Sequence, residues 1–191
     1  MTQPVLAPPR SSPTSTPQAR FRRIARFVRG LILVGSVLLV LNTLVAWFEP
    51  DYAAKLIKTQ ADVDIIGPLT LRTRVSYALW DLLSSAVFLT ALAHLWNLFG
   101  EYLHARVFSV RALASLRGFA RWMLVAAIAS PLSRTALSVI ATWQNGPGHR
   151  QVTINLSSDD YTMLLFGVVI LAISSVMAEA ARIAEDNEGF V

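Results

Sequence analysis

Four long apolar blocks constrain the fold of this chain more than any other feature of its sequence. They cover about residues 28–48, 75–99, 119–141 and 161–181. Each is close to the ~20 residues with which an α-helix crosses the hydrocarbon core of a bilayer. Because a bilayer offers no hydrogen-bond partner to open backbone, each block is predicted to be a helix. The sequence therefore predicts an all-α membrane protein, a four-transmembrane-helix bundle.

Composition supports this prediction and divides the chain into two parts. Of the 191 residues, 54% are hydrophobic and only 15% are charged, which is too apolar for an ordinary soluble domain of this size. Residues 1–19 are rich in Pro, Ser and Thr and are predicted to be a disordered N-terminal segment. Residues 20–191 form the predicted four-helix membrane domain, which begins with a basic amphipathic stretch suited to an anionic leaflet.

The distribution of Lys and Arg predicts the orientation of the helices. The N-terminal segment up to Arg29, at the start of the first block, carries six arginines and no acidic residue, and Arg106, Arg111 and Arg117 lie between the second and third blocks. The opposite loops are poorer in unbalanced cations, since the 49–74 loop has as many acids as bases and the 142–160 loop has only Arg150. Cytoplasmic loops carry the excess of Lys and Arg, so both termini are predicted to be cytoplasmic. This clustering beside the apolar blocks explains the net charge of +5 without nucleic acid, and the bilayer is the expected partner.

The loops carry further local signals. Residues 62–74 alternate in parts between apolar and polar, and residues 150–158 alternate cleanly through Val152, Ile154 and Leu156. This pattern predicts short β-strands in the two outer loops. On the inner side, the second helix is predicted to continue to about Ala105, with Ser109 as the N-cap of the next helix.

Three polar residues fall at one depth within the predicted bilayer. Counting at ~1.5 Å per residue places Asn42, Asp81 and Arg134 in a layer roughly 10 Å below the outer interface. Charged groups at this depth usually face the bundle interior and pair, so an Asp81–Arg134 ion pair completed by Asn42 is the favoured interpretation. Alternatively, a substrate, ion or proton visits this intramembrane polar layer. Arg134 could also extend outward to a loop carboxylate such as Asp159, which would leave Asp81 neutral or hydrated.

Other polar residues lie near the inner side. His94 and Glu179 are at comparable depth, so they could form an interfacial hydrogen bond or a proton-sensing pair. The acidic residues near the C-terminus, Glu185, Asp186 and Glu188, follow the fourth block, where they oppose the helix dipole. They could contact Arg111 or Arg117, dock a partner, or simply be solvated.

No motif for catalysis or cofactor binding occurs in the sequence. It lacks GxSxG, a P-loop, HExxH and a dinucleotide-binding glycine pattern, and its three histidines do not have metal-ligand spacing. With no cysteine, disulfides, thiolate catalysis and iron–sulfur clusters are excluded. The chain is therefore predicted to be no enzyme, with no catalytic residues, no metal and no cofactor.

Several segments resemble a bacterial family of four-helix integral membrane proteins, the domain-of-unknown-function family DUF2975. The resemblance covers residues 28–191 and rests on 105–108, on the LRG element at 116–118, and on the acidic cluster at 183–188. It implies a multi-pass protein of the bacterial inner membrane. Because some members are encoded beside small helix-turn-helix regulators, it also implies a sensory or regulatory role with a protein partner. A homo-oligomer is the alternative to a separate protein partner. A small transporter or permease that uses the polar layer is the alternative function.

Overall fold

All regular structure in the described part of the chain is helical. The computed structural model describes residues 17–63, 65, 69–104, 106–145 and 148–188, and for 17–20, 144 and 184–188 it describes the backbone alone. The helices are α1 (Pro17–Phe48), α2 (Pro50–Ala61), α3 (Leu71–Leu103), α4 (Val110–Thr142), a short 3-10 turn η1 (Trp143–Asn145) and α5 (Ser158–Glu188). Four of them, α1, α3, α4 and α5, are long and apolar enough to cross a bilayer. The predicted four spans are confirmed, as expected for a multi-pass membrane protein.

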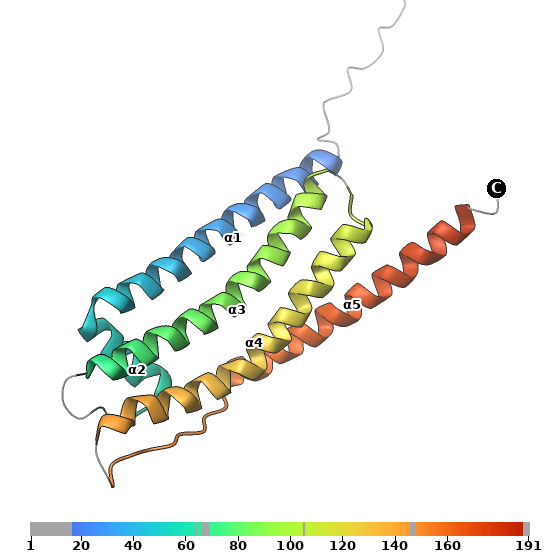
Figure 1. Ribbon diagram of the computed structural model, residues 1–191. Coiled ribbons are helices and arrows are strands. Elements are labelled where there is room, and N and C mark those ends of the chain that lie inside the picture. The colour runs from blue at the N-terminus through green and yellow to red at the C-terminus, as the bar shows by residue number, and fades with distance from the viewer. Residues whose placement is uncertain (1–16, 64, 66–68, 105, 146–147, 189–191) are drawn as a thin grey trace, which may run out of the picture.

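The four long helices lie in a row rather than in a closed bundle. Contacts run from α1 to α3, from α3 to α4 and from α4 to α5, while α2 packs against α1, α3 and α4. Figure 1 shows α5 diverging from α4 toward its C-terminus. Along the helix axes the molecule has two ends. The start of α1, the α3–α4 turn and the end of α5 lie at one of them, which we call the terminal end. The other end, where α2 lies, is the α2 end.

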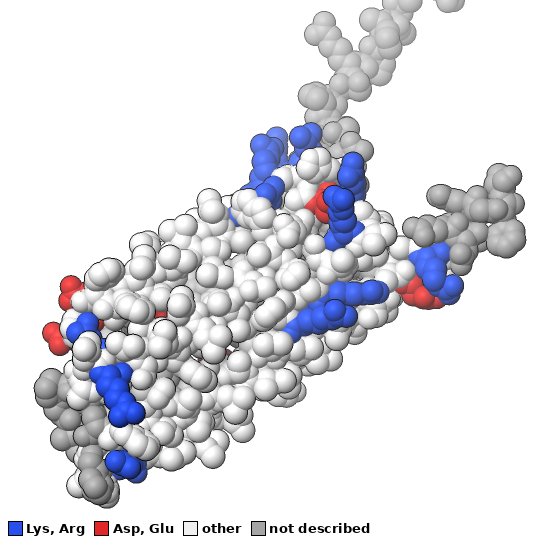
Figure 2. Space-filling model, viewed as in Figure 1, with Lys and Arg blue, Asp and Glu red and all other residues white. Residues whose placement is uncertain are grey.

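Side chains on the outside of the row are apolar over most of its length. Leu38 on α1 and Phe166 and Val176 on α5 are among the large apolar side chains that are half exposed or more. Figure 2 shows that most charged side chains on the visible face gather toward the two ends. An uncharged middle with charged ends suits a bilayer, in which charges are costly away from the headgroups.

Small residues let neighbouring long helices approach closely. A Cβ added to Gly118 on α4 would lie 2.5 Å from Nδ1 of His94 on α3. A Cβ added to Gly167 on α5 would lie 2.8 Å from Cδ2 of Leu124 on α4. Glycine at these contacts allows the van der Waals packing that holds membrane helices together.

Helix α2 was not predicted, because residues 49–74 were interpreted as one loop. Its local signals are nevertheless ordinary, with a proline in the first turn, Asp51 near the N-terminus and Lys58 in the last turn. Its buried residues Ala53, Ile57 and Ala61 recur every four positions. They pack in an apolar cluster with residues of α1, α3 and α4. Helix α2 thus packs across these three long helices at the α2 end of the molecule.

The predicted β-strands are wrong for the residues that the structure describes. Residues 150–157 form no strand, and Val152, Ile154 and Leu156 are all more than two-thirds exposed. The backbone of this segment bonds to α4 instead, through Gln151 N to Thr142 Oγ1 (3.1 Å) and Thr153 N to Ser138 Oγ (3.0 Å).

The other predicted strand region also differs. Residues 71–74 belong to α3, and 63, 65, 69 and 70 lie in the connection before it, while 64 and 66–68 are outside the described residues.

Helix boundaries agree with the sequence at some points and not at others. Ser109 is the N-cap of α4 and accepts a hydrogen bond from Ala112 N at 3.1 Å, as predicted. Helix α3 ends at Leu103, and the predicted end at Ala105 lies outside the described residues. Helix α1 begins at Pro17, inside the segment predicted to be disordered, whose residues 1–16 are also outside the described part.

Candidate functional site

A cavity of about 500 Å³ at the α2 end brings the predicted polar layer together. Asn42 from α1, Asp81 from α3 and Arg134 from α4 all line it. Five serines line the same space, namely Ser84, Ser85, Ser130, Ser133 and Ser157. Thr59 and Gln60 of α2 and Asn155 of the α4–α5 connection are exposed lining residues, so the cavity opens toward the α2 end.

Arg134 does not pair with Asp81. Its guanidinium forms an ion pair with Asp160 in the first turn of α5 and donates to the Asn155 carbonyl at 3.3 Å. The same Asp160 carboxylate accepts hydrogen bonds from the backbone N (2.9 Å) and Oγ (3.0 Å) of Ser157. The favoured prediction of an Asp81–Arg134 pair is therefore wrong. Arg134 instead extends outward to a carboxylate near the α4–α5 connection, as the alternative prediction had it. The partner is Asp160, since Asp159 is exposed.

Asn42 also has a partner other than the predicted one. Its Oδ1 accepts a hydrogen bond of 2.7 Å from the Tyr52 hydroxyl on α2. This bond joins α1 to α2 at the edge of the cavity. Asn42 therefore supports the cavity wall and does not complete an Asp81–Arg134 pair.

Asp81 is left with a buried carboxylate oxygen that has no hydrogen-bond partner among the described residues. The same is true of the Tyr77 hydroxyl and the Trp80 indole nitrogen, and all three residues line the cavity. They lie at i, i+3 and i+4 on one face of α3. Buried polar groups normally have a partner, so an unpaired acceptor beside two unpaired donors is unusual. Tyr77 and Trp80 were absent from the sequence-based site, although their spacing from Asp81 was a usable signal.

The neighbouring hydroxyl groups are satisfied. Thr43 on α1 and Ser85 on α3 share a buried hydrogen bond of 3.0 Å. Ser84 on α3 and Ser133 on α4 lie 3.4 Å apart between their oxygens. These pairs link the helices around the cavity. Besides the three groups on α3, the Nε of Arg134 is the other buried lining atom without a partner among the described residues.

The proposed inner pair, His94 and Glu179, is not brought together. The His94 ring lies against Gly118 of α4. Glu179 on α5 forms a surface ion pair with Arg182 at 2.6 Å. Because α4 lies between α3 and α5, the two residues face different neighbours.

The proposed tail contact cannot be located among the described side chains. The backbone of α5 is helical through Glu188, but the side chains of Glu185, Asp186 and Glu188 lie outside the described part. Arg111 and Arg117 line two different cavities at the terminal end. Arg117 shares its cavity with Arg182 of α5, whereas Arg111 shares the other with Arg29 of α1.

Comparison with known families adds one finding. A family described as proteins of unknown function, DUF2975, matches residues 51–190. This chain belongs to that family. The matched part of the DUF2975 protein begins in α2 and includes all of α3, α4 and α5, and therefore Asp81, Arg134 and Asp160. No curated protein and no solved structure matches the chain.

The described residues of this DUF2975 protein offer no alternative site based on a metal. Within them, no three His, Asp or Glu side chains lie close enough to hold a metal ion. The α2-end cavity is the candidate functional site because it combines the three residues of the predicted polar layer with the unpaired Asp81 oxygen.

Proposed function

We propose that this DUF2975 protein is a non-enzymatic sensor of the bacterial inner membrane. In this proposal both termini are cytoplasmic, and the α2-end cavity binds a small solute that carries a positive charge. The observation that carries the proposal is the unpaired, buried carboxylate oxygen of Asp81 in that cavity. This proposal keeps the interpretation that a solute visits the polar layer. It assigns the binding to Asp81 alone instead of to an Asp81–Arg134 pair.

The charges around the cavity favour a cationic solute. The Asp160 carboxylate matches the Arg134 charge, so Arg134 does not neutralise Asp81. An ionised Asp81 would then give the cavity a net negative charge. Charged groups within a bilayer are costly unless they are paired, and a bound cation would provide the pair.

The unpaired donors define a second requirement for the solute. The Tyr77 hydroxyl and the Trp80 indole N–H need an acceptor, and leaving each buried donor unpaired costs about 1–3 kcal/mol. A solute with an ammonium group and a nearby oxygen satisfies Asp81 and both donors together. The cavity volume of about 500 Å³ is within the usual range for sites that bind small molecules.

A binding titration tests this proposal. Purified full-length protein in lipid nanodiscs is titrated with ethanolamine and choline, with ethylene glycol as the uncharged comparison and acetate as the anion. We expect the two cations to bind and Asp81→Asn to weaken their binding about tenfold, because the attraction between the carboxylate and the cation is lost. Asp159→Asn, an exposed carboxylate at the same end, is the matched control and should bind as the unmodified protein does. No binding of either cation, or equal binding by Asp81→Asn, would contradict the proposal.

A transporter that uses the same cavity is the second candidate, favoured by its opening to one side. Transport also needs a route to the other side. The α2-end cavity extends no further along α3 than Phe88, and the cavity at the terminal end shares none of its lining residues. Flux of the bound cation into proteoliposomes, abolished by Asp81→Asn, would support transport over sensing.

A sensor must in addition change its cytoplasmic end when the solute binds. Because the chain has no cysteine, spin labels can be attached at two introduced sites, Arg106→Cys and Ala180→Cys. These positions are exposed in the α3–α4 turn and on α5. We expect ethanolamine to shift the distance between the labels, and Asp81→Asn to remove the shift. An unchanged distance at saturating ligand would count against sensing.

A further inference from the structure

We infer that the terminal end of the row contains a second site, which binds an anionic phospholipid. Its phosphodiester headgroup occupies a cavity of about 570 Å³ between α1, α3 and α4. One acyl chain occupies an adjoining groove between α1 and α3. The inference does not depend on the proposed sensing of a cation, because this cavity and the α2-end cavity share no lining residue.

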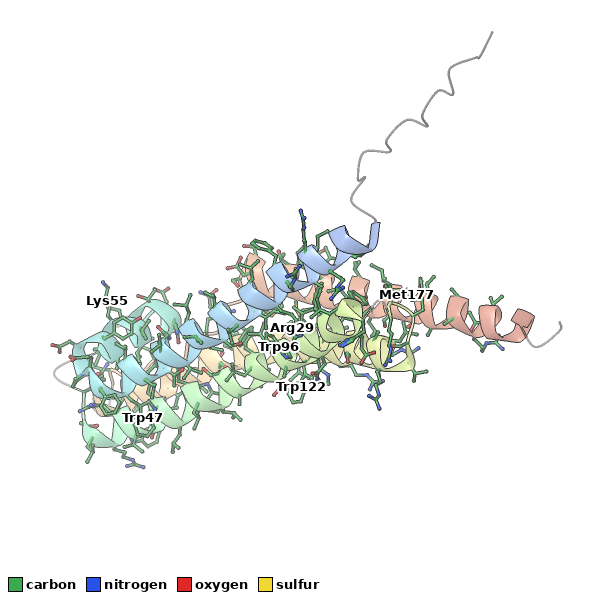
Figure 3. The ribbon with its side chains drawn as sticks, turned by 90° about the horizontal axis from the view of Figure 1, so that it is seen from above. Arg29, Trp47, Lys55, Trp96, Trp122 and Met177 are labelled. Atoms are coloured by element: carbon green, nitrogen blue, oxygen red, sulfur yellow. The ribbon has the colours of Figure 1, made fainter. Side chains whose placement is uncertain are left out.

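Arg29 forms the first wall of the headgroup cavity. Its guanidinium carbon lies 3.7 Å from the centre of the Trp96 ring, and Figure 3 shows the two side chains facing each other between α1 and α3. Stacking on the ring fixes the direction of the guanidinium plane. The Arg29 Nε is buried and has no hydrogen-bond partner in the described residues. The side chain therefore has an unused donor held in a fixed place.

Arg111 of α4 forms part of the facing wall, and the cavity has excess positive charge. Two arginines and one carboxylate, that of Glu101, line it. Glu101 accepts a hydrogen bond of 3.2 Å from the Ser109 hydroxyl, and no ion pair joins it to either arginine in the described part of the chain. One positive charge is thus left to be matched, and a phosphodiester carries one negative charge. Arginine donates in a fork that suits phosphate oxygens.

The adjoining groove indicates a lipid rather than free phosphate. It is lined by Ile32 and Leu33 of α1 and by Leu89, Leu92 and Ala93 of α3. It shares Trp96 and Asn97 with the headgroup cavity, so the basic cavity and the apolar groove form one continuous surface. A charged head joined to a hydrocarbon chain matches this surface, whereas free phosphate would use only half of it. Basic pockets between membrane helices are suited to anionic lipid headgroups.

Lipid titrations of the full-length, delipidated protein in detergent test the inference. The probes are phosphatidylglycerol, phosphatidylethanolamine, inorganic phosphate and glycerol phosphate, and binding is followed by native mass spectrometry and by the rise in Tm. We expect phosphatidylglycerol to bind at least about tenfold more tightly than the other three probes.

Four variants locate the site. Arg29→Gln and Arg111→Gln should each weaken phosphatidylglycerol binding about tenfold. Ala93→Trp, at an exposed position, should weaken it by filling the groove. The matched control is Arg26→Gln, because Arg26 is exposed on the same helix and hydrogen-bonds to the Arg22 carbonyl. It should change binding less than about twofold. If one arginine variant fails to fold, the other and Ala93→Trp still decide the result.

Several results would overturn the inference. Equal binding of phosphatidylethanolamine would remove the charge argument, and equal binding of inorganic phosphate would make this a phosphate site. A loss with Arg26→Gln as large as with Arg29→Gln would indicate general surface attraction. Asp81→Asn separates this site from the proposed function, since it should keep full phosphatidylglycerol binding.

Discussion

The two cavities lie at opposite ends of one helix row and differ in how their charges are matched. At the α2 end, the cation Arg134 is matched by Asp160, and the carboxylate of Asp81 is left over. At the terminal end, Arg29 and Arg111 exceed the one carboxylate beside them. The same scaffold thus presents one unmatched negative charge at one end and one unmatched positive charge at the other. This difference has the sign that the Lys and Arg bias of cytoplasmic loops would produce.

The largest loss of stability is expected when the ion pair between Arg134 and Asp160 is broken. Arg134→Gln leaves the buried Asp160 carboxylate without its cationic partner, which should reduce the free energy of unfolding by about 3 kcal/mol. Reversible denaturation in mixed detergent micelles measures this change. Arg72→Gln, an exposed cation at the same end, is the control and should have little effect. Similar losses in both variants would mean that the Arg134–Asp160 pair is no more than a surface contact.

A smaller loss is expected where the 150–157 segment is attached to α4. The fully buried Thr142 hydroxyl accepts from Gln151 N and donates to the Ser138 carbonyl at 2.7 Å. Thr142→Val should cost about 1 kcal/mol and make this segment more sensitive to protease. Thr162→Val is a matched control, because the exposed Thr162 hydroxyl donates to the Ser158 carbonyl in its own helix. Protease sensitivity that rises equally in the control would argue against this attachment.

The terminal end can be compared directly with the α2 end through two arginine–tryptophan contacts. Arg29 lies 3.7 Å from the Trp96 ring centre and is partly buried, whereas Arg150 lies 4.3 Å from that of Trp143 and is exposed. Arg29→Gln should therefore cost about 1 kcal/mol more than Arg150→Gln, because a desolvated cation–π contact is the stronger. The denaturation assay measures both variants. An equal or larger cost for Arg150→Gln would contradict the difference between the ends.

The smallest effect is expected at Glu179. Its pair with Arg182 joins two side chains that are each more than half exposed, and such pairs add little to stability. Glu179→Gln should leave the Tm unchanged within error. A drop as large as that of Arg134→Gln would indicate a buried partner for Glu179, such as His94.

The spans could be predicted from sequence because bilayer thickness fixes the length of an apolar helix. Depth could be predicted too, since counting residues placed Asn42, Asp81 and Arg134 at one level, and all three line one cavity. The partner of Arg134 could not be predicted, because its long side chain can reach carboxylates at a different depth from its own backbone. Whether α5 would turn Asp159 or Asp160 toward Arg134 depends on how that helix packs.

The lateral order of the helices was also beyond sequence reasoning. His94 and Glu179 share a depth, but α4 separates their helices. The strand prediction also failed because the sequence does not show which element a segment will contact. Val152, Ile154 and Leu156 alternate as a half-buried strand would, yet the backbone donors of Gln151 and Thr153 bond to hydroxyls of α4. Helix α2, in contrast, could have been predicted from the spacing of its apolar residues.

Two double-mutant cycles test the central claim that Asp81 is free for a ligand because Arg134 is held by Asp160. One combines Arg134→Gln with Asp160→Asn, and the other combines it with Asp81→Asn, with the free energy of unfolding as the readout in both. We predict a coupling of at least about 1 kcal/mol for Arg134–Asp160 and less than about 0.5 kcal/mol for Arg134–Asp81. The reverse order would mean that Arg134 and Asp81 form the ion pair and that the cavity has no unmatched carboxylate.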